Sequence, residues 1–421
     1  MFDSSPSAQT RDLGASSNAM EEFLVSCGFW GNPELRERHG YVLSPSAYVL
    51  SAKQHDQVER LARTTYRAVQ NLNESLCGIA SRTTRTNDEA RFLKLATAAS
   101  RGLCQPADGI TRIPPVFKVD LVQDQAGNFS IAEVDTYNPR GFSYGALLEE
   151  GLPAGDHARF PGIAMFEQML HDAAPAGTRW FVIVSEFERY YGTAFRFLVA
   201  LLRTRGVDID LIQETAVTPD HPILSERGVG VLAIPDTLNQ TMRKNPHIMD
   251  LSSRLVERYR NGELFAFFPP VAYLSSKGFL PFLREEDGMD EFIPETVFVG
   301  RRFELPSFIT SGRSAGVLKA TVSSGMKKVI FSDLDQREFE NALREAQASQ
   351  GFSWILQEKI EQARIPVVVF NDAGERETQE HCLRVIAFVS EAGIMDLLIT
   401  GRPDEKVHGA KDCIQLPVLT H

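Results

Sequence analysis

Residues 117–141, FKVDLVQDQAGNFSIAEVDTYNPRG, consist of two short apolar runs on either side of the turn-like sequence Asp-Gln-Ala-Gly-Asn. This arrangement predicts a β-hairpin. Side chains two positions apart in a strand point to the same face, so Glu133 and Asp135 project together, with backbones roughly 7 Å apart. The second strand of the hairpin therefore presents two carboxylates side by side.

Pairing across the turn brings a third carboxylate to this face. If the turn is centred on residues 125 and 126, Lys118 lies opposite Glu133, and Asp120 lies diagonal to it. Three carboxylates this close repel one another, and a hard divalent cation removes the conflict, because Mg²⁺ is typically held by one or two carboxylates with phosphate oxygens and water. The alternative is an exposed hairpin whose acids are solvated, which is the more frequent outcome for an arbitrary pattern of this spacing. The Pro/Gly-rich loop that follows carries Arg140, which could clamp a substrate carboxylate.

The charge balance restricts the partners. With 44 basic and 55 acidic residues the net charge is −11, which disfavours a broad nucleic-acid surface. Five cysteines without a C-x-x-C pair are typical of reduced thiols in a cytoplasmic protein. The polar start lacks a signal core, and no run of 18 or more apolar residues occurs. We therefore expect a cytoplasmic protein that binds neither nucleic acid nor a membrane, while its oligomeric state stays open.

Hydrophobic periodicity divides the chain into four segments. Residues 1–22 read as a disordered tail, and 23–158 as a helical segment followed by the acidic hairpin. Residues 159–272 alternate short apolar strands with a helical pattern, which predicts a small doubly wound α/β domain, although no G-x-G-x-x-G is present. Residues 273–421 predict antiparallel strands with helices set apart, an α+β organisation.

Two lysines in the last segment are candidate phosphate contacts. Lys319 ends a β-rich run before the small residues 323–325, whose backbone amides can approach phosphate oxygens. A plain hairpin with a Ser-Gly turn is the more frequent explanation for such a string. Lys277 lies in the first turn of a predicted amphipathic helix, which is unfavourable for a cation, so it is either functional or simply exposed.

The sequence WILQEKI predicts a strand that is interrupted by Gln357 and Glu358 and resumes at Ile360. It is either an edge strand with a polar exit or a hinge whose backbone reads an adenine edge.

Taken together, these residues resemble the ATP-grasp superfamily in its circularly permuted form, of which the amide-forming domain of glutathionylspermidine synthetase is the known relative. In the usual family order the lysines and glycine loop precede the acids, whereas here the acids come first. The resemblance covers roughly residues 112–415. It implies an α+β ATP-grasp fold in permuted order, in which residues 159–272 are a small inserted α/β domain like a pre-ATP-grasp domain.

The resemblance also implies roles for individual residues. Asp120, Glu133 and Asp135, the last at a position where Asn is commoner, correspond to the Mg²⁺ ligands. Arg140 and Arg402 are the two candidates for orienting the acyl group. The implied ATP contacts are Lys118, Lys277, Lys319, Ser323, Ser324, Gly325, Gln357, Glu358 and Ile360.

The activity implied by the resemblance is that of an ATP-dependent carboxylate–amine ligase with ATP and Mg²⁺ as cofactors. Such an enzyme forms an amide or peptide bond through an acyl phosphate, here between amino acids or small peptides, and releases ADP and phosphate. A non-catalytic nucleotide-binding scaffold or regulator is one alternative, against which the presence of all three acids and both lysines argues. An ATP-dependent phosphotransferase without ligation is the other.

Overall fold

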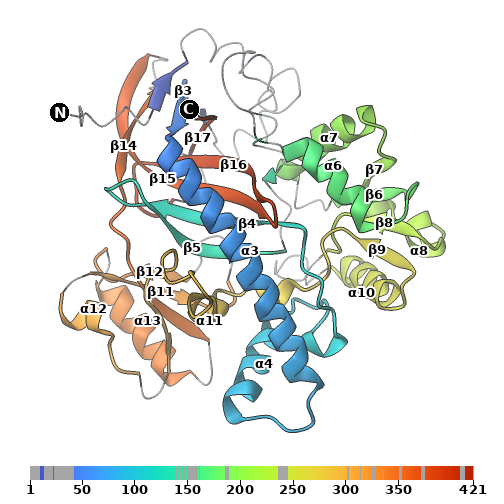
Figure 1. Cartoon of the computed structure of the whole chain (residues 1–421), viewed down its shortest axis with the longest axis horizontal. Helices are drawn as coiled ribbons and strands as arrows, with labels where there is room; N and C mark the ends of the chain where they lie inside the picture. Colours follow the sequence, from blue (N-terminus) through green and yellow to red (C-terminus); the bar gives the residue numbers. More distant parts are fainter. Residues whose placement is uncertain are drawn as a thin grey trace.

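The computed structural model places several sheets and their covering helices around two large apolar cores (Figure 1). Within the described part of the chain, backbone hydrogen bonds between strands define four sheets of three, four, seven and four strands. The residues that the structure describes are 10–13, 22, 42–137, 141–142, 145, 148, 160, 162–184, 189–235, 245–300, 303–312, 314–323, 328–334, 336–349, 353–370, 375–407 and 413–420.

The seven-stranded sheet contains the acidic hairpin. Its strand order is β2-β17-β16-β15-β4-β5, and β14 pairs with the free half of β15. All neighbours are antiparallel except β2 and β17. The strands are β2 (Val42–Leu43), β4 (Val116–Gln123), β5 (Phe129–Asp135), β14 (Arg364–Phe370), β15 (Arg376–Ser390), β16 (Gly393–Arg402) and β17 (Ile414–Leu416).

Helix α3 (Ala52–Ser81) crosses this sheet and buries its apolar stripe against it (Figure 1). The helix begins at Ser51, whose side chain accepts from the amide of Gln54 while the Gln54 side chain accepts from the amide of Ser51, a capping box. Val58, Leu61 and Val69 on the stripe are fully buried. The helical segment predicted ahead of the hairpin is therefore confirmed, and it consists of α3 and a second helix, α4 (Asn87–Ala99).

A separate four-stranded antiparallel sheet carries Lys319. Its order is β10-β13-β11-β12, with helix α13 (Gln336–Ala348) packed on one face. The strand predicted over WILQEKI is internal, since β13 pairs on both sides, so the edge-strand reading is wrong. The strands are β10 (Thr296–Val299), β11 (Gly316–Ala320), β12 (Val329–Phe331) and β13 (Trp354–Glu358), and the short helix α12 (Ser307–Thr310) precedes β11.

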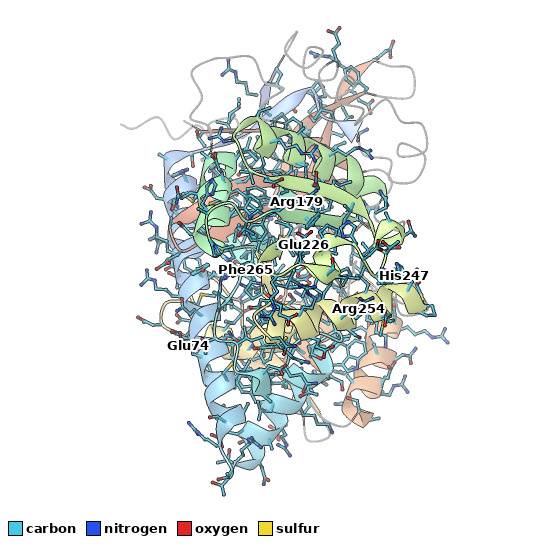
Figure 2. All side chains as sticks on the ribbon, turned by 90° about the vertical axis from the view of Figure 1, so that its right-hand side faces the viewer. Glu74, Arg179, Glu226, His247, Arg254 and Phe265 are labelled. Atoms are coloured by element: carbon cyan, nitrogen blue, oxygen red, sulfur yellow. The ribbon has the colours of Figure 1, made fainter. Side chains whose placement is uncertain are left out.

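The predicted alternation of strands and helices is present as a parallel sheet of order β7-β6-β8-β9 (Figure 1). Figure 2 views the molecule from the side of this unit. Gly230 in β8 lies against the Trp180 ring, where a Cβ would come within 2.4 Å of a ring carbon, so only glycine fits. The strands are β6 (Trp180–Val184), β7 (Ile209–Gln213), β8 (Val229–Val231) and β9 (Leu264–Ala266). The helices are α6 (Gly162–Ala173), α7 (Arg189–Thr204), α8 (Pro222–Ser225) and α10 (Pro246–Arg260).

A small sheet of order β1-β3-β18 joins segments from near both ends of the described chain. Its strands are β1 (Thr10–Asp12), β3 (Ser46–Leu50) and β18 (Val418–Thr420). Because β1 pairs with β3, the prediction of a disordered tail fails for these three residues. The mixed α+β architecture with several sheets agrees with the predicted fold class, while the permuted order, the inserted domain and the domain boundaries stay predictions.

In the described ranges no helix has both the length and the apolarity needed to cross a membrane. Cys77, Cys104, Cys382 and Cys413 are buried cysteines.

Candidate functional site

The acidic hairpin has a different register from the predicted one. Asp120 pairs directly with Glu133, and Lys118 with Asp135, whereas Leu121 pairs with Ile131. Ala132 is therefore the extra residue of a β-bulge. The turn is one residue longer than predicted, which shifts the pairing by one residue, and the bulge shifts it by one more. Because side chains alternate between the two faces of a strand, a total shift of two residues leaves all four charged side chains on one face, as predicted. The expectation that Asp120 lies diagonal to Glu133 is wrong.

Each of the three acids is paired with a cation. Glu133 Oε1 lies 2.7 Å from Lys277 Nζ, and Asp135 Oδ2 lies 3.3 Å from Lys118 Nζ. Asp120 Oδ2 is 3.7 Å from a guanidinium nitrogen of Arg384, which comes from β15. The side chains of all three acids are less than a third exposed. Basic side chains from three different elements therefore offset the crowding that the sequence predicted.

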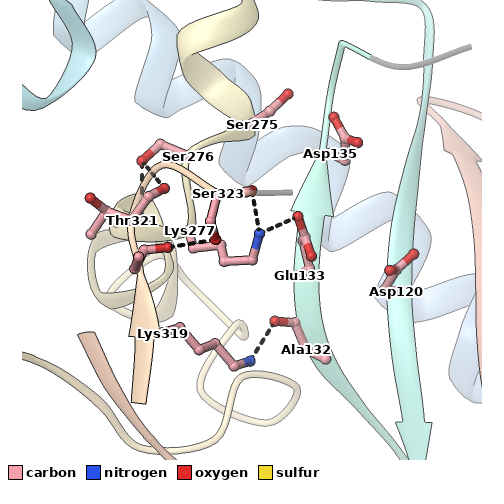
Figure 3. Close-up of polar contacts among 12 residues, drawn as sticks. Asp120, Ala132, Glu133, Asp135, Ser275, Ser276, Lys277, Lys319, Thr321 and Ser323 are labelled. Carbon is pink, nitrogen blue, oxygen red and sulfur yellow. Dashed lines mark hydrogen bonds and ion pairs between the residues drawn. The ribbon is translucent and has the colours of Figure 1, made fainter. Parts of the chain in front are cut away.

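Lys277 connects the acidic hairpin to the end of β11 (Figure 3). Its Nζ donates to Glu133 Oε1 and, at 3.0 Å, to the carbonyl of Ser323. Its backbone amide donates to the Thr321 carbonyl at 3.1 Å, and the Ser276 hydroxyl donates to the same carbonyl at 3.0 Å. The lysine is 5% exposed, so the reading of a simply exposed lysine is wrong.

The local backbone at Lys277 also differs from the expected helix. After η4 (Ala272–Ser275), a single 3₁₀ turn, η5 (Lys277–Phe279), leads into the five-residue helix α11 (Leu280–Arg284). Gly278 packs against Leu95 and Thr321, where a Cβ would come within 3.0 Å of both side chains. The turn is thus held by tertiary contacts rather than by a long helix.

Lys319 lies on the same side of the acidic hairpin as Lys277 and contacts the neighbouring residue of β5 (Figure 3). Its Nζ donates to the carbonyl of Ala132 at 2.9 Å and to Oε1 of Gln357. Burial lowers the pKa of Lys319 to about 8, with the nearby carboxylates Glu133 and Asp120 acting in the opposite direction. A lysine in this state is charged at neutral pH and becomes neutral in mildly alkaline solution.

Gln357 positions Lys319 rather than facing open space. The residue is 3% exposed, and its side-chain amide accepts from Lys319 and donates to Thr296 Oγ1 at 3.1 Å. At the exit of the strand the amide of Glu358 donates to the Glu295 carbonyl at 2.7 Å, and that of Lys359 to the Ala315 carbonyl at 2.9 Å. The adenine-contact role of Gln357, Glu358 and the half-buried Ile360 stays a prediction.

The sheet face that presents Lys319 also presents an apolar cluster that the sequence reading missed. Val317, Val329 and Phe331 form a cluster separate from the core under α13. Val317 pairs with Phe331 and Lys319 pairs with Val329, so all four side chains share a face. The signal was present as the i, i+2 spacing of Val317 and Lys319. An apolar cluster beside a lysine is suited to a base next to a phosphate chain.

Five other predicted residues have different outcomes. Ser323 contributes its carbonyl to Lys277, and its hydroxyl donates to the Ala320 carbonyl at 3.2 Å. Arg402 pairs with Cys382 of β15, whereas Asp120 pairs with Ile386 of the same strand, four residues further along. The Arg402 guanidinium donates to the Lys406 carbonyl at 2.8 Å. Arg140, Ser324 and Gly325 lie outside the described residues.

The carboxylates of the hairpin fit a hard cation by their chemistry. Asp120 and Glu133 are directly opposite on one face, and Oδ1 of Asp120 is buried without a hydrogen-bond donor among the described residues. Oxygen ligands of this kind suit Mg²⁺. In the arrangement described here, where each acid faces its own cation, no group of three His, Cys, Asp or Glu side chains within the described ranges is placed to hold a metal ion.

Comparison with known proteins supports the fold. The sequence matches no protein-family profile and no curated protein. Among solved structures, a glutathione synthetase-like effector (GSS30) from Globodera pallida in its apo form aligns over 97% of both chains with a TM-score of 0.56 and 13% identity. The ATP-grasp ligase PsnB complexed with minimal precursor aligns over 52% of this chain and 89% of its own, with a TM-score of only 0.31 and 11% identity, and adds no support. The first likeness, at this identity, shows a shared fold alone.

Proposed function

We propose that this chain is an ATP-dependent ligase of the ATP-grasp type that joins a carboxylate to an amine through an acyl phosphate. The observation that carries the proposal is the convergence of two buried lysines on the acidic hairpin. Lys277 bonds to Glu133, and Lys319 bonds to the neighbouring Ala132, although the lysines and the hairpin are far apart in the sequence. Two cations and three carboxylates gathered on one hairpin suit a triphosphate and its metal ion.

Each group has a role in nucleotide binding. Lys277 and Lys319 contact phosphate oxygens and offset their charge, and the face of Val317 and Phe331 receives the adenine. Asp120, Glu133 and Asp135 would hold Mg²⁺, which supplies charge neutralisation between the phosphates when bound. Lys277 is bonded to Glu133 in this structure, and its transfer to a phosphate oxygen leaves Glu133 available as a ligand.

The chemical step then needs mainly positioning. A carboxylate oxygen of the substrate attacks the γ-phosphorus, the bond from that phosphorus to the β,γ-bridging oxygen breaks, and ADP leaves. An amine attacks the acyl carbon, loses a proton and expels phosphate. The sequence resemblance makes Arg140 and Arg402 the two candidates for orienting the acyl group. Lys319, which lies near the carboxylates Glu133 and Asp120, stabilises negative charge as it develops on the transferred phosphoryl group.

A non-catalytic nucleotide-binding scaffold is the second candidate, and one observation favours it. All three acids have a cationic partner in the structure, an arrangement that needs no metal. A phosphotransferase without ligation shares the nucleotide site but would leave a stable phosphorylated product.

Product analysis separates the three functions. Purified protein is incubated with Mg·ATP and pooled amino acids, dipeptides and amines, and ADP, phosphate and new masses are measured. The ligase forms ADP and a condensed product only when a carboxylate and an amine are both present. ATP binding without any product in every mixture favours the scaffold and contradicts the ligase, whereas a phosphorylated product that persists without an amine favours the phosphotransferase.

A further inference from the structure

A row of polar side chains crosses the seven-stranded sheet beside the acidic hairpin. Arg384 of β15 pairs with Thr400 of β16, and Thr400 pairs with Gln415 of β17. Directly paired residues in antiparallel strands share a face, so the three side chains lie on one face of the sheet. The face is the one that carries Asp120, because Ile386, two positions from Arg384, pairs with Asp120.

This row differs from the rest of the face around it. Ile386, Phe388 and Leu398 on the same face belong to an apolar core, and the opposite face packs on α3. Thr400 and Gln415 are each 2% exposed, yet they are polar. Burying polar groups costs free energy unless they find partners, so a polar row in this place calls for a ligand or a compensating contact.

Gln415 supplies the observation that points to a ligand. Its side-chain amide oxygen is fully buried, and none of the residues that the structure describes donates a hydrogen bond to it. Its backbone carbonyl accepts from the amide of Ser44 at 2.8 Å, so the unsatisfied acceptor is the side-chain oxygen. Leaving such a group unsatisfied is unfavourable, and a bound hydrogen-bond donor would remove this cost.

The other end of the row reaches the proposed phosphoryl-transfer site. A guanidinium nitrogen of Arg384 lies 3.7 Å from Asp120 Oδ2, and Asp120 is directly opposite Glu133. A carboxylate bound to Arg384 would therefore lie next to the proposed position of the γ-phosphate. Arg384 was not among the residues expected from the sequence.

We propose that Arg384, Thr400 and Gln415 bind the carboxylate substrate, a proposal that rests on the ligase function proposed above. Arg384 binds the reacting carboxylate in a forked, two-hydrogen-bond contact. Thr400 and Gln415 hydrogen-bond the groups behind it, and Gln415 matches a peptide amide because its side chain both donates and accepts.

The length of the row sets the size of this substrate. Two strand spacings separate Arg384 from Gln415, about 10 Å. An extended chain covers this distance with about three residues. The substrate class is accordingly a short peptide of two or three residues with a free carboxyl group.

Affinity selection with mass spectrometry tests the proposal without ATP. A library of dipeptides and tripeptides with free carboxyl ends and the same library with amidated ends are incubated with the intact protein, and retained peptides are identified and titrated. Free-carboxyl peptides are expected to be retained, and their amidated counterparts are expected to bind about tenfold more weakly or worse.

Three variants resolve the roles. Arg384→Lys keeps the charge beside Asp120 but loses the fork, so it is expected to weaken binding about tenfold, whereas Arg376→Lys, an exposed control on the same strand, leaves it unchanged. Gln415→Leu is expected to weaken binding about two- to tenfold while Tm stays the same or rises, because the variant removes an unsatisfied buried group. A purely structural glutamine would give the reverse, a lower Tm with unchanged binding.

Retention of neither library, equal retention of both, or full affinity in Arg384→Lys would overturn the assignment. These failures are distinct from failure of the ligase proposal. ADP formation that depends on an acid and an amine, but with no retained peptide, would contradict the assignment of the polar row and leave the ligase proposal standing. Retained peptides without any ADP formation would contradict the ligase proposal and leave the peptide site standing.

Discussion

Lys319 donates a 2.9 Å hydrogen bond to the carbonyl of Ala132, the extra residue of the bulge in the acidic hairpin. A bulged residue leaves the regular ladder, which allows its carbonyl to accept from a side chain instead of from the neighbouring strand. The contact joins the sheet that carries the lysine to the sheet that carries the acids. Removing either the bulge or the lysine therefore alters the distance between the two halves of the candidate site.

Glu133→Gln is expected to reduce ATP-dependent turnover by about 100-fold or more, because it removes a proposed metal ligand and the partner of Lys277. It also leaves the buried Lys277 charge without its carboxylate, so the free energy of unfolding falls by about 1–3 kcal/mol. Steady-state ADP release and urea unfolding measure the two effects.

Glu291→Gln is the matched control for this change, because Glu291 pairs with Arg60 at 2.8 Å while both side chains are about half exposed or more. It is expected to change unfolding by less than about 0.5 kcal/mol and turnover not at all. Full activity in Glu133→Gln would remove this residue from the site.

Nucleotide affinity is expected to fall as pH rises through about 8, because Lys319, whose pKa burial lowers to about 8, then loses its charge. Calorimetric titration of ATP at pH values about one unit on either side of that pKa measures the change. Lys319→Met should bind weakly at every pH, without the alkaline decline. An identical decline in Lys319→Met would show that another group titrates.

The same lysine makes stability depend on pH in the opposite sense. The pKa of Lys319 is lower in the folded chain than in the unfolded chain, so below about 8 both states are protonated and the cost of burying the charge is constant. Between about 8 and 10.5 the unfolded chain binds more protons, and stability rises with pH by up to about 3 kcal/mol relative to Lys319→Met. Urea unfolding of both proteins across this window measures the difference.

Gln357→Leu is expected to lower the free energy of unfolding by about 1–3 kcal/mol, because the side chain bonds both Lys319 and Thr296. The same substitution at Gln415, equally buried but with an amide oxygen unsatisfied within the described residues, is expected to be neutral or stabilising. Thermal unfolding of the two variants compares one chemical change in two hydrogen-bonding environments. Equal destabilisation would mean that the hydrogen bonds of Gln357 contribute nothing.

Phe331→Ala is expected to weaken ATP binding about tenfold while leaving the affinity for inorganic triphosphate unchanged, since Phe331 belongs to the apolar face assigned to the adenine. Lys277→Met should weaken both ligands because it acts on the phosphates. Competition titrations with the two ligands give the comparison. Equal losses for both ligands in Phe331→Ala would place the base elsewhere.

The elements with strong periodicity were predictable from the sequence. Helix α3 has an apolar stripe and a Ser51 cap, and β6, α7 and β7 follow the βαβ rhythm, so local patterns determine them. The proximity of Lys277 and Lys319 to the hairpin came from the family resemblance, since no local pattern specifies which distant segments meet.

The details that sequence reasoning missed depend on tertiary contacts. The bulge at Ala132 has no sequence signature, and together with the longer turn it pairs Asp120 with Glu133 instead of placing the two diagonally. Arg384 lies in β15 just before its apolar half, and its proximity to Asp120 follows from the pairing of β15 with β4. Pairing between strands distant in the chain is set by the whole sheet, and a single sequence does not reveal it.

The parallel pairing of β18 with β3 has a consequence for biosynthesis. A ribosome delivers β3 early and β18 late, so the hydrogen-bonding edge of β3 stays open to solvent or to other chains while most of the polypeptide is made. An open edge of this kind is a template for unwanted strand addition. Nascent chains stalled before Val418 are expected to need chaperone protection that the completed protein does not.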